Sequence, residues 1–131
     1  MRKPMRGIQL RWLPIAAYFG VTLVAGSASA GKADVLEAEA RQASDGTWTF
    51  TVTVQHDDAG WDHYANAWVV LAPDETVLGE RVLLHPHDLE QPFTRSASGI
   101  RIPDDIDHVI IRARDLVHGF GGAELTLELP R

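Results

Sequence analysis

Apolar and polar residues alternate along most of the chain beyond residue 34, in short runs separated by turn residues. The clearest run covers residues 47–56, where threonines occupy one face and the other face carries Trp48, Phe50, Val52 and Val54. A period of two residues is typical of a half-buried β-strand. Similar runs predict further strands at residues 35–42, 65–71, 77–84, 93–102, 108–115 and 125–129.

These runs amount to about seven strands with turn signals between them and no helical periodicity. The pattern predicts an all-β domain, a single antiparallel two-sheet sandwich of the immunoglobulin or fibronectin III kind. A small jelly roll or an open barrel is the alternative architecture. Gly99, inside the run 93–102, predicts a β-bulge.

The first thirty residues have the pattern of a secretory signal peptide. A basic start is followed by an apolar run at residues 12–25 and by the small residues Ala28, Ser29 and Ala30. The apolar run is shorter than the roughly twenty residues that a membrane-spanning helix needs. We therefore expect residues 1–30 to be removed, with cleavage after Ala33 as the second option, which leaves one domain at residues 31–131 in the periplasm or outside the cell.

Removal of this segment makes the remaining domain strongly acidic. Four of the twelve basic residues precede residue 31, whereas all eighteen acidic residues follow it, so eight basic residues face eighteen acidic ones and the net charge is near −10. Such a domain is repelled by nucleic-acid phosphates and by anionic lipid head groups. We expect no nucleic-acid partner and no membrane contact after cleavage.

The chain contains no cysteine, and both methionines lie in the predicted signal peptide. This composition excludes disulfides, catalytic thiols and metal sites built on sulfur. All six histidines follow residue 31. Any metal site in the domain is therefore expected to use imidazole nitrogens and oxygen atoms.

If each connection reverses the chain, three of the connections lie at the same end of the sandwich: residues 57–64, 85–92 and 116–123. These connections are the richest in histidine, and loops at one end of a sandwich are common binding sites. His108 is expected at the opposite end. The candidate metal ligands are thus His56, His63, His85, His87 and His118.

The residue types around these histidines favour a metal site. Pro86 forces His85 toward an extended conformation, so His85 and His87 are expected to point the same way, as a ligand pair. His118 lies among glycines that permit unusual backbone torsions. Neutral imidazole binds Zn²⁺ and Cu²⁺. Six nearby carboxylates are candidates to complete or orient the ligand shell: Asp57, Asp58, Asp62, Asp88, Glu90 and Asp115.

Three segments, HDDAGWDHYANAW, LLHPHDLEQPFTR and RDLVHGFGG, resemble segments of hypothetical secreted bacterial proteins. The chain as a whole is similar to small exported bacterial proteins with an immunoglobulin-like sandwich. This resemblance implies a fold and export, and no activity.

The sequence therefore predicts an exported, non-catalytic sandwich that binds a divalent transition metal, copper or zinc, through histidines on loops at one end. No established metal-binding motif such as HExxH is present, so the prediction depends on the convergence of the loops. The alternative is a module that binds a periplasmic protein or a carbohydrate through the same loops, with Trp61 as an exposed aromatic contact.

Overall fold

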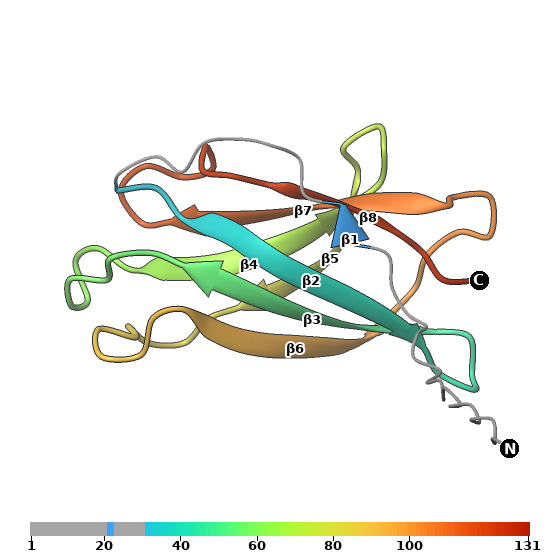
Figure 1. Ribbon diagram of the computed structural model, residues 1–131, viewed down its shortest axis with the longest axis horizontal. Coiled ribbons are helices and arrows are strands. Elements are labelled where there is room, and N and C mark those ends of the chain that lie inside the picture. Colours follow the sequence, from blue (N-terminus) through green and yellow to red (C-terminus); the bar gives the residue numbers. More distant parts are fainter. Residues whose placement is uncertain (1–20, 23–30) are drawn as a thin grey trace, which may run out of the picture.

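A computed structural model of the chain describes residues 21–22 and 31–131 (Figure 1). The predicted signal peptide at residues 1–30 lies outside the described residues, apart from Val21 and Thr22. Among the described residues, no helix has the length and apolar character needed to cross a membrane.

The described residues form two antiparallel sheets. One sheet has the order β2-β3-β6, and the other has the order β8-β7-β4-β5, with the two-residue β1 beside β8. The predicted all-β, two-sheet sandwich is confirmed. The strands are β1 (Val21–Thr22), β2 (Asp34–Gln42), β3 (Trp48–Gln55), β4 (Ala65–Leu71), β5 (Val77–Val82), β6 (Phe93–Ile100), β7 (His108–Asp115) and β8 (Leu125–Glu128).

Two predicted strands extend two residues beyond the observed ones. The strand predicted at 77–84 ends at Val82, and the strand predicted at 93–102 ends at Ile100. The predicted bulge is present: Gly99 has a φ of 73°, and the register between β3 and β6 shifts beside it. The extra residue that a bulge inserts explains why β6 alternates less regularly than its neighbours.

The strand order differs in one respect from that of constant immunoglobulin domains. In those domains the fourth strand of seven pairs in the sheet of the first, second and fifth strands. Here β5, the fourth strand when counting starts at β2, pairs with β4 in the other sheet. The sandwich therefore has a three-stranded and a larger sheet.

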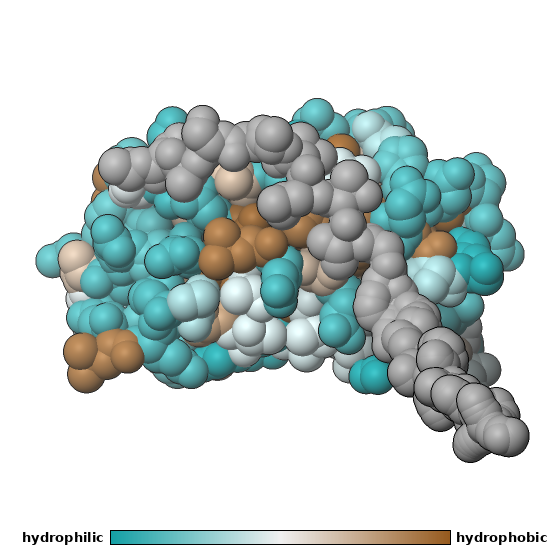
Figure 2. Space-filling model, in the orientation of Figure 1, coloured by the Kyte–Doolittle hydropathy of each residue, from teal (hydrophilic) through white to brown (hydrophobic). Residues whose placement is uncertain are grey.

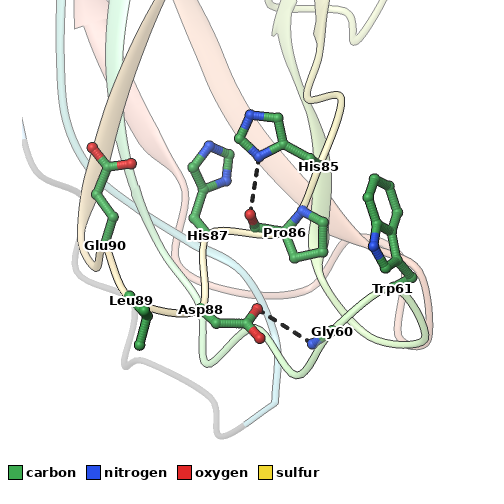
Figure 3. Close-up of a pocket in the computed structure, with 8 residues that line it drawn as sticks. All are labelled: Gly60, Trp61, His85, Pro86, His87, Asp88, Leu89 and Glu90. Carbon is green, nitrogen blue, oxygen red and sulfur yellow. Dashed lines mark hydrogen bonds between the residues drawn. The ribbon is translucent and has the colours of Figure 1, made fainter.

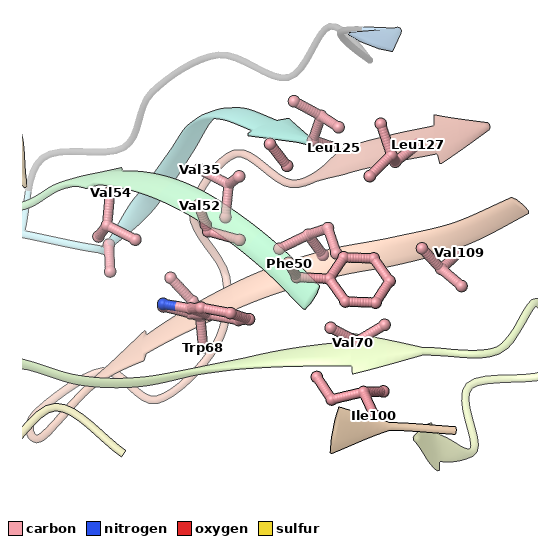
Figure 4. Packing of buried hydrophobic residues seen from close by; sticks show 14 of the residues in the cluster. Val35, Phe50, Val52, Val54, Trp68, Val70, Ile100, Val109, Leu125 and Leu127 are labelled. Atoms are coloured by element: carbon pink, nitrogen blue, oxygen red, sulfur yellow. The ribbon is translucent and has the colours of Figure 1, made fainter. Parts of the chain in front are cut away.

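The hydrophobic core lies between the two sheets (Figure 4). Trp48, Phe50 and Trp68 are fully buried there, as the alternation in β3 predicts. β4 is buried on both faces for most of its length, which explains its continuous apolar sequence. Among the described residues, the core cluster runs from Ala33 to Leu129.

The β3–β4, β5–β6 and β7–β8 connections gather at one end of the sandwich, at the left in Figure 1, beside the start of β2. This is the end at which the sequence predicts a binding surface. Figure 2 shows a mostly hydrophilic face with an apolar protrusion at this end, over the β5–β6 connection. His108 begins β7 at the opposite end, as expected.

Candidate metal centre

Three buried or partly buried side chains converge at the loop end. His56 directly follows β3, His63 lies in the β3–β4 connection, and Asp115 ends β7. β3 and β7 belong to different sheets, so the group joins both layers of the sandwich. Each of the three residues offers a ligand atom, and these atoms all lie within 4.8 Å of one another.

The distances within this group are short. Nε2 of His56 lies 3.2 Å from Nε2 of His63, and Nε2 of His63 lies 3.2 Å from Oδ1 of Asp115. The carbonyl oxygen of Gly31 lies 3.2 Å from each of the two Nε2 atoms. Four residues thus present nitrogen or oxygen atoms to one small volume.

The tautomer of His56 follows from its other ring nitrogen. Nδ1 of His56 lies 2.6 Å from Oδ1 of Asp58, and both side chains are fully buried. A carboxylate only accepts, so Nδ1 carries the proton and donates it to Asp58. When Nε2 of His56 carries no proton, its lone pair faces His63 and Gly31. Histidine ligands of metals are commonly oriented by a carboxylate in this way.

The two oxygens of Asp115 have different roles. Oδ1 accepts hydrogen bonds from the backbone N–H groups of Val117 and His118, at 2.9 and 2.7 Å, and from Nδ1 of His118 at 3.1 Å. Oδ2 is buried without a hydrogen-bond partner and lies 3.8 Å from Nε2 of His56. An unpartnered buried carboxylate oxygen is costly unless a cation or a donor reaches it.

Asp115 is ionised despite its burial. Burial pushes the pKa of Asp115 upward, but the hydrogen bonds from the backbone of His118 and Val117 and from the His118 ring outweigh it and hold the pKa below its ordinary value. The carboxylate is therefore an anion. A carboxylate anion beside two imidazole nitrogens and the carbonyl oxygen of Gly31 forms a site suited to a cation.

His118 lies at the edge of the group. Its ring centroid is 5.0 Å from that of His63, and its Nδ1 donates to Asp115. In this arrangement His118 orients the carboxylate of Asp115. The structure thus brings together His56, His63 and His118 of the five histidines that the sequence singled out.

His85 and His87 form a separate pair in the β5–β6 connection. Their ring centroids lie 4.6 Å apart, so the predicted side-by-side placement is present (Figure 3). The backbone N–H of His87 donates to Oδ2 of Asp58 at 2.7 Å, and Asp58 in turn accepts from His56, so this carboxylate links the pair to His56. Among the described residues, the metal-compatible group does not include His85 or His87.

The environment of His87 is that of a packed structural residue. Its ring stacks on Phe93 at 3.9 Å between centroids, and Nη2 of Arg95 donates to its Nε2 at 3.0 Å. Burial lowers the pKa of His87, and the charges of Arg95 and His85 lower it further. The ring is thus a neutral acceptor whose lone pair already faces a cation. Ligation of a metal by His85 and His87 stays a prediction, and the Arg95 contact argues against it.

Three further residues of the centre differ in how far the sequence indicates them. Asp115 and Asp58 belong to the six carboxylates considered as shell or orienting residues. Gly31 is missed entirely, because a carbonyl oxygen has no signature in a sequence. The feature of the sequence that could have pointed to Gly31 is its position directly after the predicted cleavage site.

The same end of the sandwich exposes several large apolar side chains. Trp61 is 65% exposed, Leu84 is 74% exposed and Leu89 is fully exposed. Gly60, Trp61 and residues 85–90 line a shallow depression between the β3–β4 and β5–β6 connections (Figure 3). Trp61 packs edge-on against Tyr64, with 5.7 Å between ring centroids.

Comparison with known proteins finds a similar archaeal protein. The chain is 39% identical over 99 residues to a protein of the halophilic archaeon Halomicrobium mukohataei named "Putative lipoprotein". The alignment covers 74% of this chain and 47% of the relative, so the chain spans about half the length of that protein. No protein-family model and no solved structure matches the chain.

Proposed function

We propose that this protein binds a divalent transition metal, copper or zinc, through Nε2 of His56, Nε2 of His63 and Oδ2 of Asp115. Asp58 and His118 would orient the first and last of these ligands from behind. The observation that carries the proposal is the convergence of two imidazole nitrogens and an ionised carboxylate within 4.8 Å.

The spacing of these atoms supports the proposal. With metal–ligand bonds of 2.0–2.1 Å, the ligands of a tetrahedral site lie about 3.3 Å from one another. The two Nε2 atoms lie 3.2 Å apart, and Oδ2 of Asp115 lies 3.8 Å from Nε2 of His56. A metal ion would thus fit between the three residues with only small side-chain movements, and it would satisfy the unpartnered Oδ2 of Asp115.

We propose binding rather than catalysis, in an exported protein. The side chains of His56 and Asp115 are fully buried, which leaves little room for a substrate at the metal. The name of the archaeal relative and the signal-peptide pattern both favour export. Since the chain has no cysteine to carry a lipid, the processed domain would be periplasmic or secreted.

The second candidate is a module that binds a periplasmic protein or a carbohydrate. The exposed Trp61 and Leu89, which line a shallow depression, favour it, because exposed apolar side chains around a depression are typical of binding surfaces. This function would use the β5–β6 side of the loop end and would need no metal.

Calorimetric titration with Zn²⁺ and Cu²⁺ tests the first proposal. We expect one metal per chain, and we expect His63→Ala and Asp115→Asn to weaken binding by at least about 100-fold, because each removes a direct ligand. Asn at position 115 retains an oxygen for the backbone bonds and removes the charge.

Two matched variants serve as controls. His108→Ala removes an imidazole at the opposite end, and His85→Ala removes an exposed imidazole of the separate pair. Both are expected to leave the affinity unchanged. Loss of binding in His85→Ala would move the site to the β5–β6 connection, and no binding by the unmodified domain would favour the interaction module.

A further inference from the structure

Gly31 is built into the metal centre by both its carbonyl group and its lack of a side chain. Its oxygen lies 3.2 Å from Nε2 of His56 and 3.2 Å from Nε2 of His63. Its φ is 82°, and a Cβ at this position would lie 2.9 Å from Cε1 of His118. Only glycine combines this backbone conformation with such a close approach to the imidazole.

The residues that follow hold Gly31 in this place. Ala33, Asp34 and Val35 are buried. The backbone N–H of Val35 donates to the oxygen of Ala123 at 2.8 Å, and the N–H of Ala123 donates to Oδ1 of Asp34 at 2.7 Å. A Cβ at Gly122 would overlap the oxygen of Ala33, so the two segments cross in direct contact. Ala33, two residues after Gly31, is thus held in place by this contact.

The nitrogen of Gly31 is also close to the centre. Covalent geometry keeps the nitrogen and the carbonyl oxygen of any residue within about 3.6 Å of each other. As part of a peptide bond this nitrogen is a hydrogen-bond donor and offers no lone pair. As a free α-amino group it loses a proton at about pH 8 and then binds metals.

We propose that removal of the signal peptide after Ala30 completes the metal centre, because the new α-amino group of Gly31 becomes a ligand. The amine and the carbonyl oxygen of Gly31 would hold the metal in a five-membered chelate, and His56, His63 and Asp115 would supply the remaining ligands. The inference rests on the proposed function and extends it. Metal loading would follow export, since in the unprocessed chain this nitrogen is a peptide amide without a free lone pair.

The completed ligand set also selects the metal. It contains three nitrogens and two oxygens, with no sulfur. A tetragonal arrangement of nitrogen and oxygen ligands is typical of Cu²⁺, whereas structural Zn²⁺ prefers four ligands in a tetrahedron. The proposed metal of the processed protein is therefore Cu²⁺.

The test compares the processed protein with its free and its acetylated amino terminus. The protein is exported from a bacterial host, its intact mass gives the first residue, and circular dichroism verifies that acetylation leaves the fold unchanged. Both forms are titrated with Cu²⁺. We expect acetylation of Gly31 to weaken Cu²⁺ binding by at least about 100-fold, as for loss of a direct ligand.

A second measurement identifies the nitrogen directly. Labelling with ¹⁵N-glycine changes the nitrogen couplings in the electron paramagnetic resonance spectrum of bound Cu²⁺ only if a glycine nitrogen is a ligand. We expect this change in the free form and not in the acetylated form.

Three results would overturn the inference. The first two leave the proposed function standing, and the third does not. Equal Cu²⁺ affinity of both forms, with binding still lost in His63→Ala, would remove Gly31 from the shell and leave the proposed function standing. A processed terminus at a residue other than Gly31 would do the same. No Cu²⁺ binding by either form would overturn the proposed function and the inference together.

Discussion

Asp58 connects the two histidine groups at the level of single residues. Its Oδ1 accepts from Nδ1 of His56 and from the backbone N–H of Ala65, at 2.6 and 3.0 Å, and its Oδ2 accepts from the N–H of His87. A fully buried carboxylate with three donors is well compensated. Asp58 therefore fixes the tautomer of His56 and the path of two loops at once.

His87 makes the stability of the metal-free protein depend on pH. Its pKa is lowered in the folded state by burial, and then by Arg95 and His85, whereas in the unfolded chain it is near 6.5. As the pH falls below about 6.5, this histidine binds a proton more readily in the unfolded chain than in the folded protein. The free energy of unfolding therefore decreases as the pH decreases. Above that pH the contribution is constant.

The variant His87→Gln removes this titration and retains a side-chain acceptor for Arg95. We expect the free energy of unfolding of the variant to depend less on pH between about 6.5 and 5 than that of the unmodified protein. Urea unfolding at several pH values, with a chelator present, measures this. Parallel curves for the two proteins would show that His87 does not carry the dependence.

At the level of elements, β3 joins the core to the metal centre. Its inward residues run from Trp48 to Val54, and His56 continues the same phase beyond the end of the strand. A shift of one residue in register would turn all of them to the opposite face. The hydrophobic alternation of β3 thus places His56 inward, where Asp115 of β7 meets it.

Trp48 tests this phase directly. Its side chain is fully buried in the core. Trp48→Ala is therefore expected to lower the free energy of unfolding by about 3–5 kcal/mol, because apolar burial is lost and a cavity is left behind. Trp61→Ala, at a 65% exposed loop position, is expected to change it by less than about 0.5 kcal/mol. Urea unfolding of both variants is the measurement. A loss below about 1 kcal/mol for Trp48→Ala would contradict the assigned strand phase.

At the level of the whole molecule, the proposed metal would join the two sheets, because His56 follows β3 of one sheet and Asp115 ends β7 of the other. A ligand that binds only the folded state stabilises it by an amount set by its concentration relative to Kd. Bound metal is therefore expected to stabilise the fold as a unit.

At a free metal concentration of 100 times Kd, this stabilisation is about 2.7 kcal/mol, which in a domain of this size raises Tm by roughly 10 °C or more. Thermal unfolding with and without Zn²⁺ or Cu²⁺ measures the effect, and a chelator is expected to reverse it. The same shift in Asp115→Asn would place the metal elsewhere, and no shift in any form would contradict a site that needs both sheets.

Much of the fold follows from local pattern. Strands such as β4 and β7 have the ends that the alternation predicts, and Gly99 forms the expected bulge. The connections alternate between the two ends of the sandwich, which correctly places three histidine-rich loops together. These features are predictable because side-chain alternation and turn residues act over a few neighbouring positions.

The sequence by itself determined the two-sheet architecture and the end of the molecule at which the histidines gather. Only the tertiary structure decided which of them meet, since contact between His56, His63 and Asp115 depends on how two sheets pack and on how the β3–β4 connection folds against the end of β7. The same packing placed Arg95 against His87, and it brought the carbonyl of Gly31 to the centre. Asp115 is 52 residues from His63 in the chain and Gly31 is 25 from His56, and no local pattern encodes contacts over such separations.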